Sequence, residues 1–391
     1  MTIMLNLTES LLLGLFAKFL GASIKNKVIF LHRFNFPDPI VGGFIFAILN
    51  FILYMFTPYK VHYDLSLQII FMQFFFTSLG LNTPILLLYK HKNIFIKFFI
   101  IAGLLSICQF FIGVSLCNFL NLNPLIGIIA GPISLFGDFS FAVVFGRTIE
   151  NLGFFEGKDL AIASATFGVI ANSIIAIPIG TYLINRLNLI PKTKNKKVGL
   201  SLNKINSNYS NNLLTNITFF IAIIVFSNLF SLLIHNIFNI IFPVYIICLI
   251  IGLFINWISP YKIDKKFSFT LNKLSLNLFL SMSIISLKIW DLLTIIKPLF
   301  FILFFQFVFV IFYSYIFTFY IFGKNYKAVL LSCGLCGLSL GSISNSISNM
   351  NELSKKYGSY SEIFLIVPLV GTFIMNFFLI PLILYSINFF I

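Results

Sequence analysis

Long apolar runs constrain this sequence more than any other feature. A run of about twenty apolar residues is long enough to cross the hydrocarbon core of a bilayer as one helix. Because 59% of the 391 residues are hydrophobic and only 9% are charged, a soluble fold could not bury so much apolar surface. We therefore expect an all-α integral membrane protein with about ten transmembrane helices. The expected spans are 4–24, 38–57, 65–88, 95–120, 160–184, 213–235, 239–258, 271–293, 298–322 and 361–386.

The N-terminal run and the net charge of +15 each have an alternative interpretation. The first run has the length of a signal peptide, but it lacks a basic beginning and an Ala-x-Ala site, so we interpret it as a span. A positive charge of this size can indicate a nucleic-acid-binding protein. Here the basic residues lie in short loops between apolar runs, which is the pattern of membrane topology. Nucleic acid is therefore not an expected partner.

Two segments differ from the rest because they are rich in Gly, Ser and Asn. Gly131-Pro-Ile-Ser-Leu-Phe-Gly-Asp-Phe-Ser140 lies in the segment 123–147, and Gly334 to Asn349 lies in the segment 327–350. Glycine weakens a helix and allows backbones or ligands to approach closely. In hydrocarbon, a broken helix survives only where it is packed in protein or lines a wet cavity. We expect both segments to be re-entrant and to carry the functional site.

The distribution of Lys and Arg favours re-entry. If both segments return to the side from which they enter and the N-terminus is outside, 20 of the 26 Lys and Arg face the cytoplasm. If both segments cross, 12 lie inside and 13 outside, so the positive-inside rule favours the re-entrant arrangement. The expected outside residues are Lys60, Arg147, Lys158, Lys288 and Lys297. Both termini are then periplasmic, and the basic linker 185–212 is cytoplasmic.

The chain divides into two halves with the same order of elements. Residues 1–184 form the expected first repeat and residues 213–391 the second, each with five spans and one re-entrant segment. Gly168 and Pro178 stand ten residues apart in one half, as Gly371 and Pro381 do in the other. Five crossings per half is an odd number, so the halves must be inverted relative to each other. Inverted repeats are typical of secondary transporters.

Asp138 is the only acidic residue in either special segment. A charge at the centre of a bilayer costs roughly 2.5–3.5 kcal/mol, so Asp138 is a candidate functional residue; a neutral or vestibule carboxyl is the alternative. Uncharged Ser and Asn oxygens suit hard cations, and freed N–H groups suit a carboxylate. The tentative sodium ligands are Asp138, Ser344 and Asn345. The full set of candidate substrate- and ion-binding residues is Gly137, Asp138, Ser140, Thr166, Asn172, Cys336, Gly337, Ser339, Gly341, Ser342, Ser344, Asn345, Asn349, Thr372 and Asn376.

Collinear blocks along nearly the whole chain resemble the bacterial sodium/glutamate symporter family. They include Pro37-Asp-Pro-Ile-Val-Gly-Gly43, Phe75-Phe-Thr-Ser-Leu-Gly-Leu-Asn82, Asn123-Pro-Leu-Ile-Gly-Ile-Ile-Ala-Gly131 and Val367-Pro-Leu-Val-Gly371. The resemblance implies a sodium-driven glutamate importer of the bacterial inner membrane, with two five-helix repeats. It implies no cofactor apart from sodium as the coupling ion. Expected partners are glutamate or a similar small anion, sodium and lipid, and a homodimer is a candidate assembly.

The re-entrant segments depart from that family. Where the family's first loop resembles Gly-Gly-His-Gly-Thr, this chain has Gly137-Asp138-Phe139-Ser140-Phe141. In the second loop Leu335 replaces a His and Ser339 a Gly, while Cys336, Gly337 and Gly341 remain. A proton-coupled carrier, or one with an altered carboxylate substrate, therefore stays open as an alternative on the same scaffold.

Three other classes of protein are compatible with parts of the sequence. An intramembrane aspartyl protease needs a second aspartate in the middle of the membrane beside the Gly137-Asp138 pair, and no other expected span has an aspartate near its middle. A channel needs a continuous pore, whereas an inverted repeat suits alternating access. A repurposed transporter is the third class.

The Cys333-x-x-Cys336 pair has the spacing of a redox or zinc motif. Zinc would need two further ligands nearby, and the sequence has none there, so we do not expect a zinc site. We expect a transporter and not an enzyme.

Overall fold

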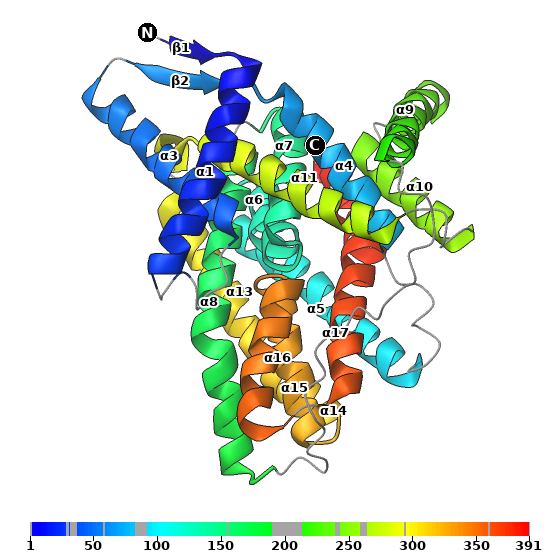
Figure 1. Cartoon of the computed structure of the whole chain (residues 1–391). Coiled ribbons are helices and arrows are strands. Elements are labelled where there is room, and N and C mark those ends of the chain that lie inside the picture. The colour runs from blue at the N-terminus through cyan, green and yellow to red at the C-terminus, as the bar shows by residue number, and fades with distance from the viewer. Residues whose placement is uncertain are drawn as a thin grey trace. The chain divides into compact units, whose positions relative to one another are not determined.

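The computed structural model describes residues 2–28, 31, 37–57, 59–82, 92–154, 156–189, 213–238, 243–258, 264–292, 295–358 and 360–390. Almost all the described residues are helical (Figure 1), and the chain is an all-α membrane protein whose described part contains one short pair of strands. Seven helices in the described part are long and apolar enough to cross a membrane. They are Leu7–Lys27, Asp38–Phe56, Lys92–Phe119, Gly157–Arg186, Leu214–Ile234, Ile296–Ile321 and Glu362–Phe390.

The described residues of the three remaining expected spans are mostly helical, but these helices are too short or not apolar enough to count as membrane spans by the same measure. Helix α4 (Ser66–Asn82) has 17 residues and α10 (Val244–Ile258) has 15. Helix α11 (Lys265–Ile285) has 21 residues, but lysines and many Ser and Asn residues lower its hydropathy. Of the expected basic linker 185–212, residues 190–212 lie outside the described part of the chain.

A two-stranded parallel ribbon changes the expected start of the first span. Strand β1 (Thr2–Leu5) pairs with β2 (Lys60–Tyr63), and Met4 lies opposite His62. Residues 4 and 5 were expected inside the span 4–24, but their backbone groups are used in the ribbon. Helix α1 (Leu7–Lys27) therefore begins at Leu7.

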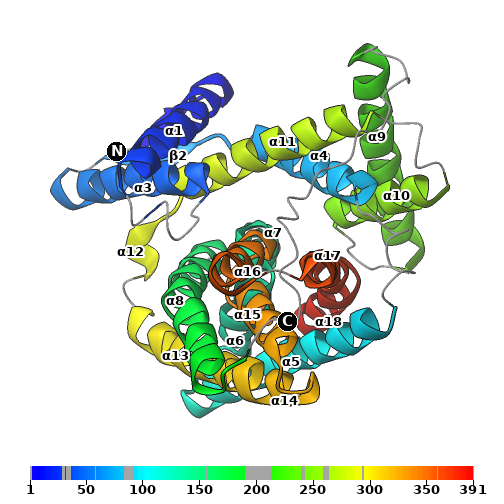
Figure 2. The same ribbon diagram turned by 60° about the horizontal axis from the view of Figure 1, so that its bottom comes forward.

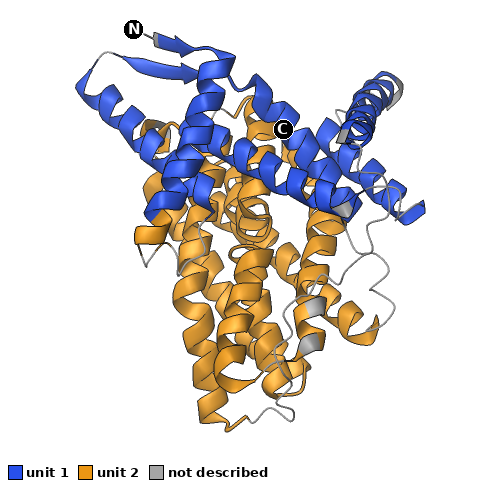
Figure 3. Ribbon diagram, viewed as in Figure 1, with its two compact units in different colours: residues 1–24, 37–87, 201–286 blue, residues 25–36, 88–200, 287–391 orange. Residues whose placement is uncertain are grey.

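The described helices form two compact units, coloured separately in Figure 3. Unit 1 contains residues 1–24, 37–87 and 201–286, with α1, α3 (Asp38–Phe56), α4, α9 (Leu213–Phe238), α10 and α11. Small residues allow its helices to approach closely, as in other membrane bundles. A β-carbon on Gly42 would meet the main-chain oxygen of Ala17, and one on Gly80 would lie 2.4 Å from Leu249 O. Glycine is therefore required at both crossings.

Unit 2 contains residues 25–36, 88–200 and 287–391. Its long helices are α5 (Lys92–Phe119), α8 (Gly157–Arg186), α13 (Ile296–Phe312) and α17 (Ser361–Phe373), the last continued by η4 (Ile374–Leu379) and α18 (Ile380–Phe390). Helix α13 continues through η3 (Tyr313–Thr318) and α14 (Phe319–Ile321) as one span, and the short helix α12 (Ile289–Leu292) precedes it. Figure 2 shows α15 and α16 enclosed by α8, α13, α5 and α17. Both glycine-rich segments belong to this unit.

Each unit takes corresponding elements from the two halves of the chain. Unit 1 holds the first three helices of each half, and unit 2 holds the last two long helices of each half together with the special segment between them. Residues about two hundred positions apart thus pack in the same unit.

Candidate functional site

The second special segment is a helical hairpin, which we call the second hairpin (residues 326–357). Helix α15 (Tyr326–Ser339) begins where the side-chain oxygen of Asn325 accepts a hydrogen bond from Ala328 N at 3.0 Å. Helix α16 (Ile343–Tyr357) begins where the Ser342 hydroxyl accepts from Asn345 N at 3.2 Å. The Tyr326 hydroxyl donates to Gly358 O at 2.5 Å. The start of α15 and the end of α16 therefore meet, and residues 340–342 form the tip.

The two arms of the second hairpin are in close contact because Gly337 has no side chain. A β-carbon there would lie 2.4 Å from the Cα of Ser346. The Ser346 hydroxyl donates across the arms to Gly334 O at 2.8 Å. Cys336 is fully buried in α15. Gly341 faces the side chain of Asn345, whose Nδ2 would lie 2.5 Å from an added β-carbon.

The first special segment, residues 124–151, is broken twice. It comprises α6 (Pro124–Ile128), the π-helical η2 (Ile129–Phe136) and α7 (Asp138–Asn151). Gly131 leaves the helical region at φ −119° and ψ −114°, next to Pro132, which has no N–H to donate. A kink at Gly131 therefore divides η2 into two helical pieces. The second break is at Gly137 and Asp138.

Asp138 has a left-handed backbone, with φ at +62°. Its carboxylate Oδ1 accepts from Ser140 N at 2.6 Å and so caps the first turn of α7. A negative charge is favourable at a helix N-terminus. Ser140 is buried beside it. A β-carbon on Gly137 would lie 2.3 Å from Ile133 O, so glycine is needed there too.

The two special segments meet beside the middle of α8. A β-carbon on Gly168 would lie 2.6 Å from the main-chain oxygen of Leu340, at the tip of the second hairpin, and 2.8 Å from the side chain of Leu135 in η2. The Nε2 of Gln109 donates to Ser339 O at 3.2 Å. The structure thus brings together Ser339 and Gly341 at one tip and the broken helix η2 of the first segment.

Two expected asparagines join α8 to α16. Asn349 Nδ2 donates to Asn172 Oδ1 at 3.0 Å, and both residues are buried. Among the described residues, Asn172 Nδ2 has no hydrogen-bond partner, and neither amide atom of Asn376 in η4 has one. The hydroxyl of Ser134 in η2 is also unpartnered there. Buried polar groups normally have partners, and unpaired ones mark places for ligand, ion or water.

Several other expected residues bond within their own helices. The hydroxyls of Thr166 and Thr372 donate to the carbonyls of Ile162 and Pro368, four residues earlier. Ser339 Oγ donates to Leu335 O at 2.8 Å. Such bonds are common for hydroxyls in helices. Ser344 is exposed, whereas its neighbour Asn345 is buried.

Some prominent interactions in unit 2 were not expected from the sequence. Tyr315 in η3 donates to Ala176 O, and the thiol of Cys333 donates to the same oxygen at 3.8 Å. At the turn between α7 and α8, Glu150 accepts from Lys158 N at 3.3 Å, and the carboxylate of Asp159 accepts from Lys288 N at 3.2 Å. Lys158 and Asp159 are both buried. The Tyr315 bond could not be predicted, because the residues around a tyrosine in an apolar run do not show which distant carbonyl it will bond to.

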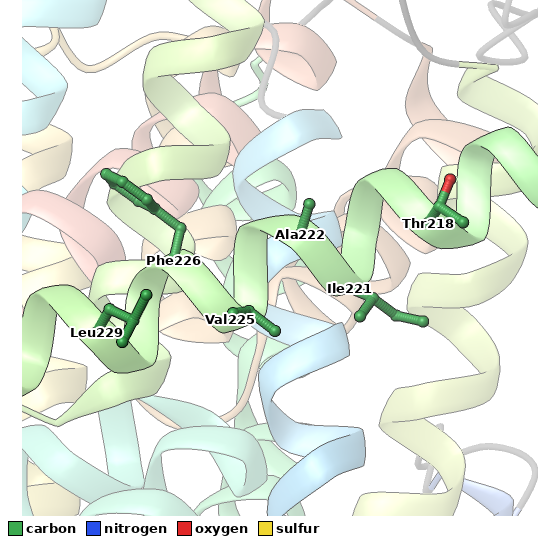
Figure 4. Close-up of a pocket in the computed structure, with 6 residues that line it drawn as sticks. All are labelled: Thr218, Ile221, Ala222, Val225, Phe226 and Leu229. Carbon is green, nitrogen blue, oxygen red and sulfur yellow. The ribbon is translucent and has the colours of Figure 1, made fainter.

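A surface hollow on α9 of unit 1 does not fit a polar ligand. It is lined by Thr218, Ile221, Ala222, Val225, Phe226 and Leu229 (Figure 4). All six belong to this one helix, and Thr218 supplies its only polar side chain. Exposed apolar side chains on a membrane helix are expected to face lipid.

Comparison with known proteins agrees with these observations. Residues 3–359 match the family model described as Sodium/glutamate symporter. The chain is 30% identical over 367 residues to the Sodium/glutamate symporter of Escherichia coli (strain K12), covering 91% of each chain. It is 29% identical over 380 residues to that of Haemophilus influenzae, covering 94% of each chain. The chain therefore belongs to the sodium/glutamate symporter family, whose members are membrane transporters and not enzymes.

Proposed function

We propose that this protein imports glutamate, or a related acidic amino acid, together with sodium across the inner membrane by alternating access. The observation that carries the proposal is the meeting of two broken segments inside unit 2. Leu340 at the tip of the second hairpin and Leu135 in η2 both lie against Gly168. Buried, unpartnered polar atoms of Ser134, Asn172 and Asn376 belong to the same unit. The similar proteins of Escherichia coli and Haemophilus influenzae are sodium/glutamate symporters, which indicates the substrate and the ion.

The proposed architecture has ten transmembrane helices in two inverted five-helix repeats, residues 1–184 and 213–391. It is supported by the identical order of elements that each half contributes to the two units. The linker 185–212 would be cytoplasmic and both termini periplasmic. This orientation is supported by the excess of Lys and Arg on one side.

Re-entry of both special segments is part of this proposal. For the second hairpin it is supported by the bond between Tyr326 and Gly358. For the first segment, the supporting contacts lie at the ends of α5 and α8. Phe98, near the start of α5, packs on Phe322, and a β-carbon on Gly180, near the end of α8, would lie 3.7 Å from the Val329 side chain. The end of α5 and the start of α8, which flank the first segment, then lie together at the opposite end of unit 2.

The proposed anion site uses the starts of α7 and α16. These two helices begin at the breaks of the two segments, and helix N-termini offer N–H groups and a positive dipole end to a carboxylate. Asn172, Asn349 and Asn376 would add amide groups, and Asn172 has an Nδ2 without a partner in the described part. Gly137, Gly337 and Gly341 would let the backbone approach the substrate. Ser140, Thr166, Cys336, Ser339, Ser342 and Thr372 complete the proposed lining.

Sodium would bind at Asp138 and Asn345, with Ser344 as a third proposed ligand. Asp138 supports this role best, because its carboxylate is oriented by hydrogen bonds from Ser140 and from the Phe141 backbone, and a carboxylate has further lone pairs for an ion. Asn345 is buried next to Gly341. Ser344 has the weakest support of the three because its side chain is exposed.

Radiolabelled uptake into proteoliposomes tests the proposed function. We expect saturable, electrogenic uptake of glutamate that requires an inward sodium gradient. Uptake driven by a proton gradient alone, or of another carboxylate, would favour the alternative carrier. Passive flux that does not saturate would indicate a channel. The mass of the purified protein in detergent tests a homodimer, which is the assembly we propose.

A further inference from the structure

Two buried glutamines connect three elements at the centre of unit 2. Gln109 of α5 and Gln306 of α13 are both fully buried. Gln109 Nε2 donates to Ser339 O at the tip of the second hairpin at 3.2 Å, and Gln306 Nε2 donates to Gln109 O at 2.6 Å. Both amides therefore bond between helices, as lone polar side chains in membrane helices commonly do. The two hydrogen bonds also fix how each amide group is turned.

Both acceptors are main-chain carbonyls, which cannot donate a hydrogen bond. If either amide were turned over, two oxygens would face each other, so the nitrogens must occupy the bonded positions. The Oε1 atoms of Gln109 and Gln306 must then point away from those carbonyls. Both oxygens are buried, and neither finds a hydrogen-bond donor among the described residues.

The surroundings of Gln306 are also rich in oxygen. A β-carbon on Gly131 would lie 3.1 Å from Gln109 O and 3.2 Å from Gln306 Nε2, so the unwound backbone at Gly131 packs against both glutamines. Pro132 follows and has no N–H, so a carbonyl of the preceding turn lacks its helical donor. The Ser134 hydroxyl, which is 1% exposed, is unpartnered in the described part.

These groups have a common chemistry. The two amide oxygens and the freed carbonyl are acceptors without a donor, and the Ser134 hydroxyl has an unused lone pair, in the interior of a membrane protein where each unsatisfied group is costly. Helix α15 ends at Ser339, next to Gln109, and brings the negative end of its dipole. Amide, hydroxyl and freed main-chain oxygens next to broken helices are the ligands that alkali cations take in transporters.

We propose that Gln109 Oε1, Gln306 Oε1 and the unwound backbone at Gly131 bind a sodium ion. This inference rests on the proposed function and gives sodium a site separate from the one proposed at Asp138, Asn345 and Ser344. It also provides a route for coupling. The amide of Gln109 has two contacts in this proposal. Its oxygen would bind the ion, and its nitrogen donates to Ser339 O at the tip of the second hairpin. An ion at this position would therefore favour one placement of Ser339.

Sodium binding and transport are measured separately to test the inference. Gln109→Met and Gln306→Met keep the approximate length of the side chain and remove the amide. Thermal unfolding of the purified protein is followed in sodium chloride and in choline chloride at equal ionic strength. We expect sodium to stabilise the wild type, with a half-effective concentration at least about tenfold higher in both variants, as expected when one good ligand is lost. Gln306→Glu can donate and accept as a neutral acid, and it should recover sodium binding.

The control is Gln68→Met in unit 1, which removes another buried amide bond between helices, from Gln68 Nε2 to Ser283 Oγ at 2.9 Å. It should lower thermal stability and leave the sodium concentration dependence unchanged. The inference is overturned if sodium does not stabilise the wild type, or if folded Gln306→Met responds to sodium as the wild type does; a structural water would then occupy the position. If sodium binding depends on Gln306 but glutamate is not taken up, the proposed function fails and this site stands.

Discussion

Asp138 combines an unusual backbone with a polar side chain at the break between η2 and α7. Its φ of +62° is the conformation that glycine adopts most easily and that Asn and Asp tolerate better than other residues. This backbone explains why an aspartate is acceptable at position 138. The carboxylate also caps α7 through Ser140 N, so a structural role and an ion-binding role must be separated by experiment.

Substitutions of Asp138 separate these two roles. Asp138→Asn keeps an oxygen that can accept from Ser140 N, tolerates the left-handed backbone and removes the charge. We expect normal protein amounts and a sodium concentration for half-maximal uptake that is about tenfold higher or more. Asp138→Ala loses the cap as well and adds roughly 1–2 kcal/mol of backbone strain, so its thermal midpoint should also fall. Unchanged sodium and pH dependence of uptake in Asp138→Asn would leave Asp138 as a cap alone.

At the scale of single residues, the sequence indicates the region of the site better than its members. The Gly, Ser and Asn content marks both breaks, and Asn172 and Asn349 are among the expected residues. Their mutual bond joins positions 177 apart in the chain, and a local pattern cannot predict such a pairing. The sequence also does not show which hydroxyls are free for a ligand and which bond within their own helix. Thr166 and Thr372 bond to their own helices, and Ser344 faces outward while Asn345 faces inward.

At the scale of elements, the second hairpin depends on close contact between its arms. Because Gly337 faces the main chain of Ser346, an added β-carbon would lie 2.4 Å from a Cα that cannot move by itself. At Gly341 an added β-carbon would lie 2.5 Å from Asn345 Nδ2, the end of a side chain that can turn away, and 3.2 and 3.3 Å from Gly337 O and Asn345 Cβ, which would have to move only slightly. The two glycines lie four residues apart in the same segment, so they form a matched pair for substitution.

Gly337→Ala should separate α15 from α16, whereas Gly341→Ala should be accommodated by a change of the Asn345 rotamer. We expect Gly337→Ala to lower stability by about 1–3 kcal/mol, the usual cost of overpacking, and to reduce uptake strongly. Gly341→Ala should cost less stability, and its main effect should be on substrate or ion affinity. Thermal unfolding and uptake assays measure both effects. Equal thermal midpoints for the two variants would contradict the close packing described for Gly337.

Periodicity and run length predict most elements but not their breaks. Runs of about twenty apolar residues correspond to the seven long helices, because span length is fixed by the bilayer. The exact position of the kink at Gly131 was not predicted. A kink depends on the residues that pack around it, which here are Gln109 and Gln306. The ribbon of β1 and β2 was also missed, because four-residue strands carry little signal.

At the scale of the whole molecule, the sequence predicts two halves, and the structure adds how their helices are shared. Helices α1, α3 and α4 lie in the same unit as α9, α10 and α11, and the remaining long helices lie in unit 2. Order along the chain indicates the repeat, but which helices pack together depends on long-range contacts. The crossing of α4 and α10 at Gly80 and Gly252 is one such contact.

The expected topology places five basic residues outside, and three of them have acidic neighbours in unit 2. Arg147, Lys158 and Lys288 all interact electrostatically with Glu150, and Lys158 also interacts with Asp159. Cations paired with carboxylates in the folded protein are partly neutralised. The positive-inside rule counts Lys and Arg and not net charge, so these three residues still count as outside residues.

Cysteine labelling of intact cells tests this topology at the bases of the two special segments. Asn151, after α7, and Lys356, at the end of α16, are both exposed, and under the proposed re-entry they lie on opposite sides of the membrane. We expect Asn151→Cys to react with an impermeant maleimide added outside, and Lys356→Cys to react only after the cells are permeabilised. The unsubstituted protein is the baseline, because four of its five cysteines are buried. A single cysteine in the linker 185–212 should behave like Lys356→Cys. If Asn151→Cys and Lys356→Cys were labelled from the same side, one segment would have to cross the membrane completely, and the inverted repeat would be wrong.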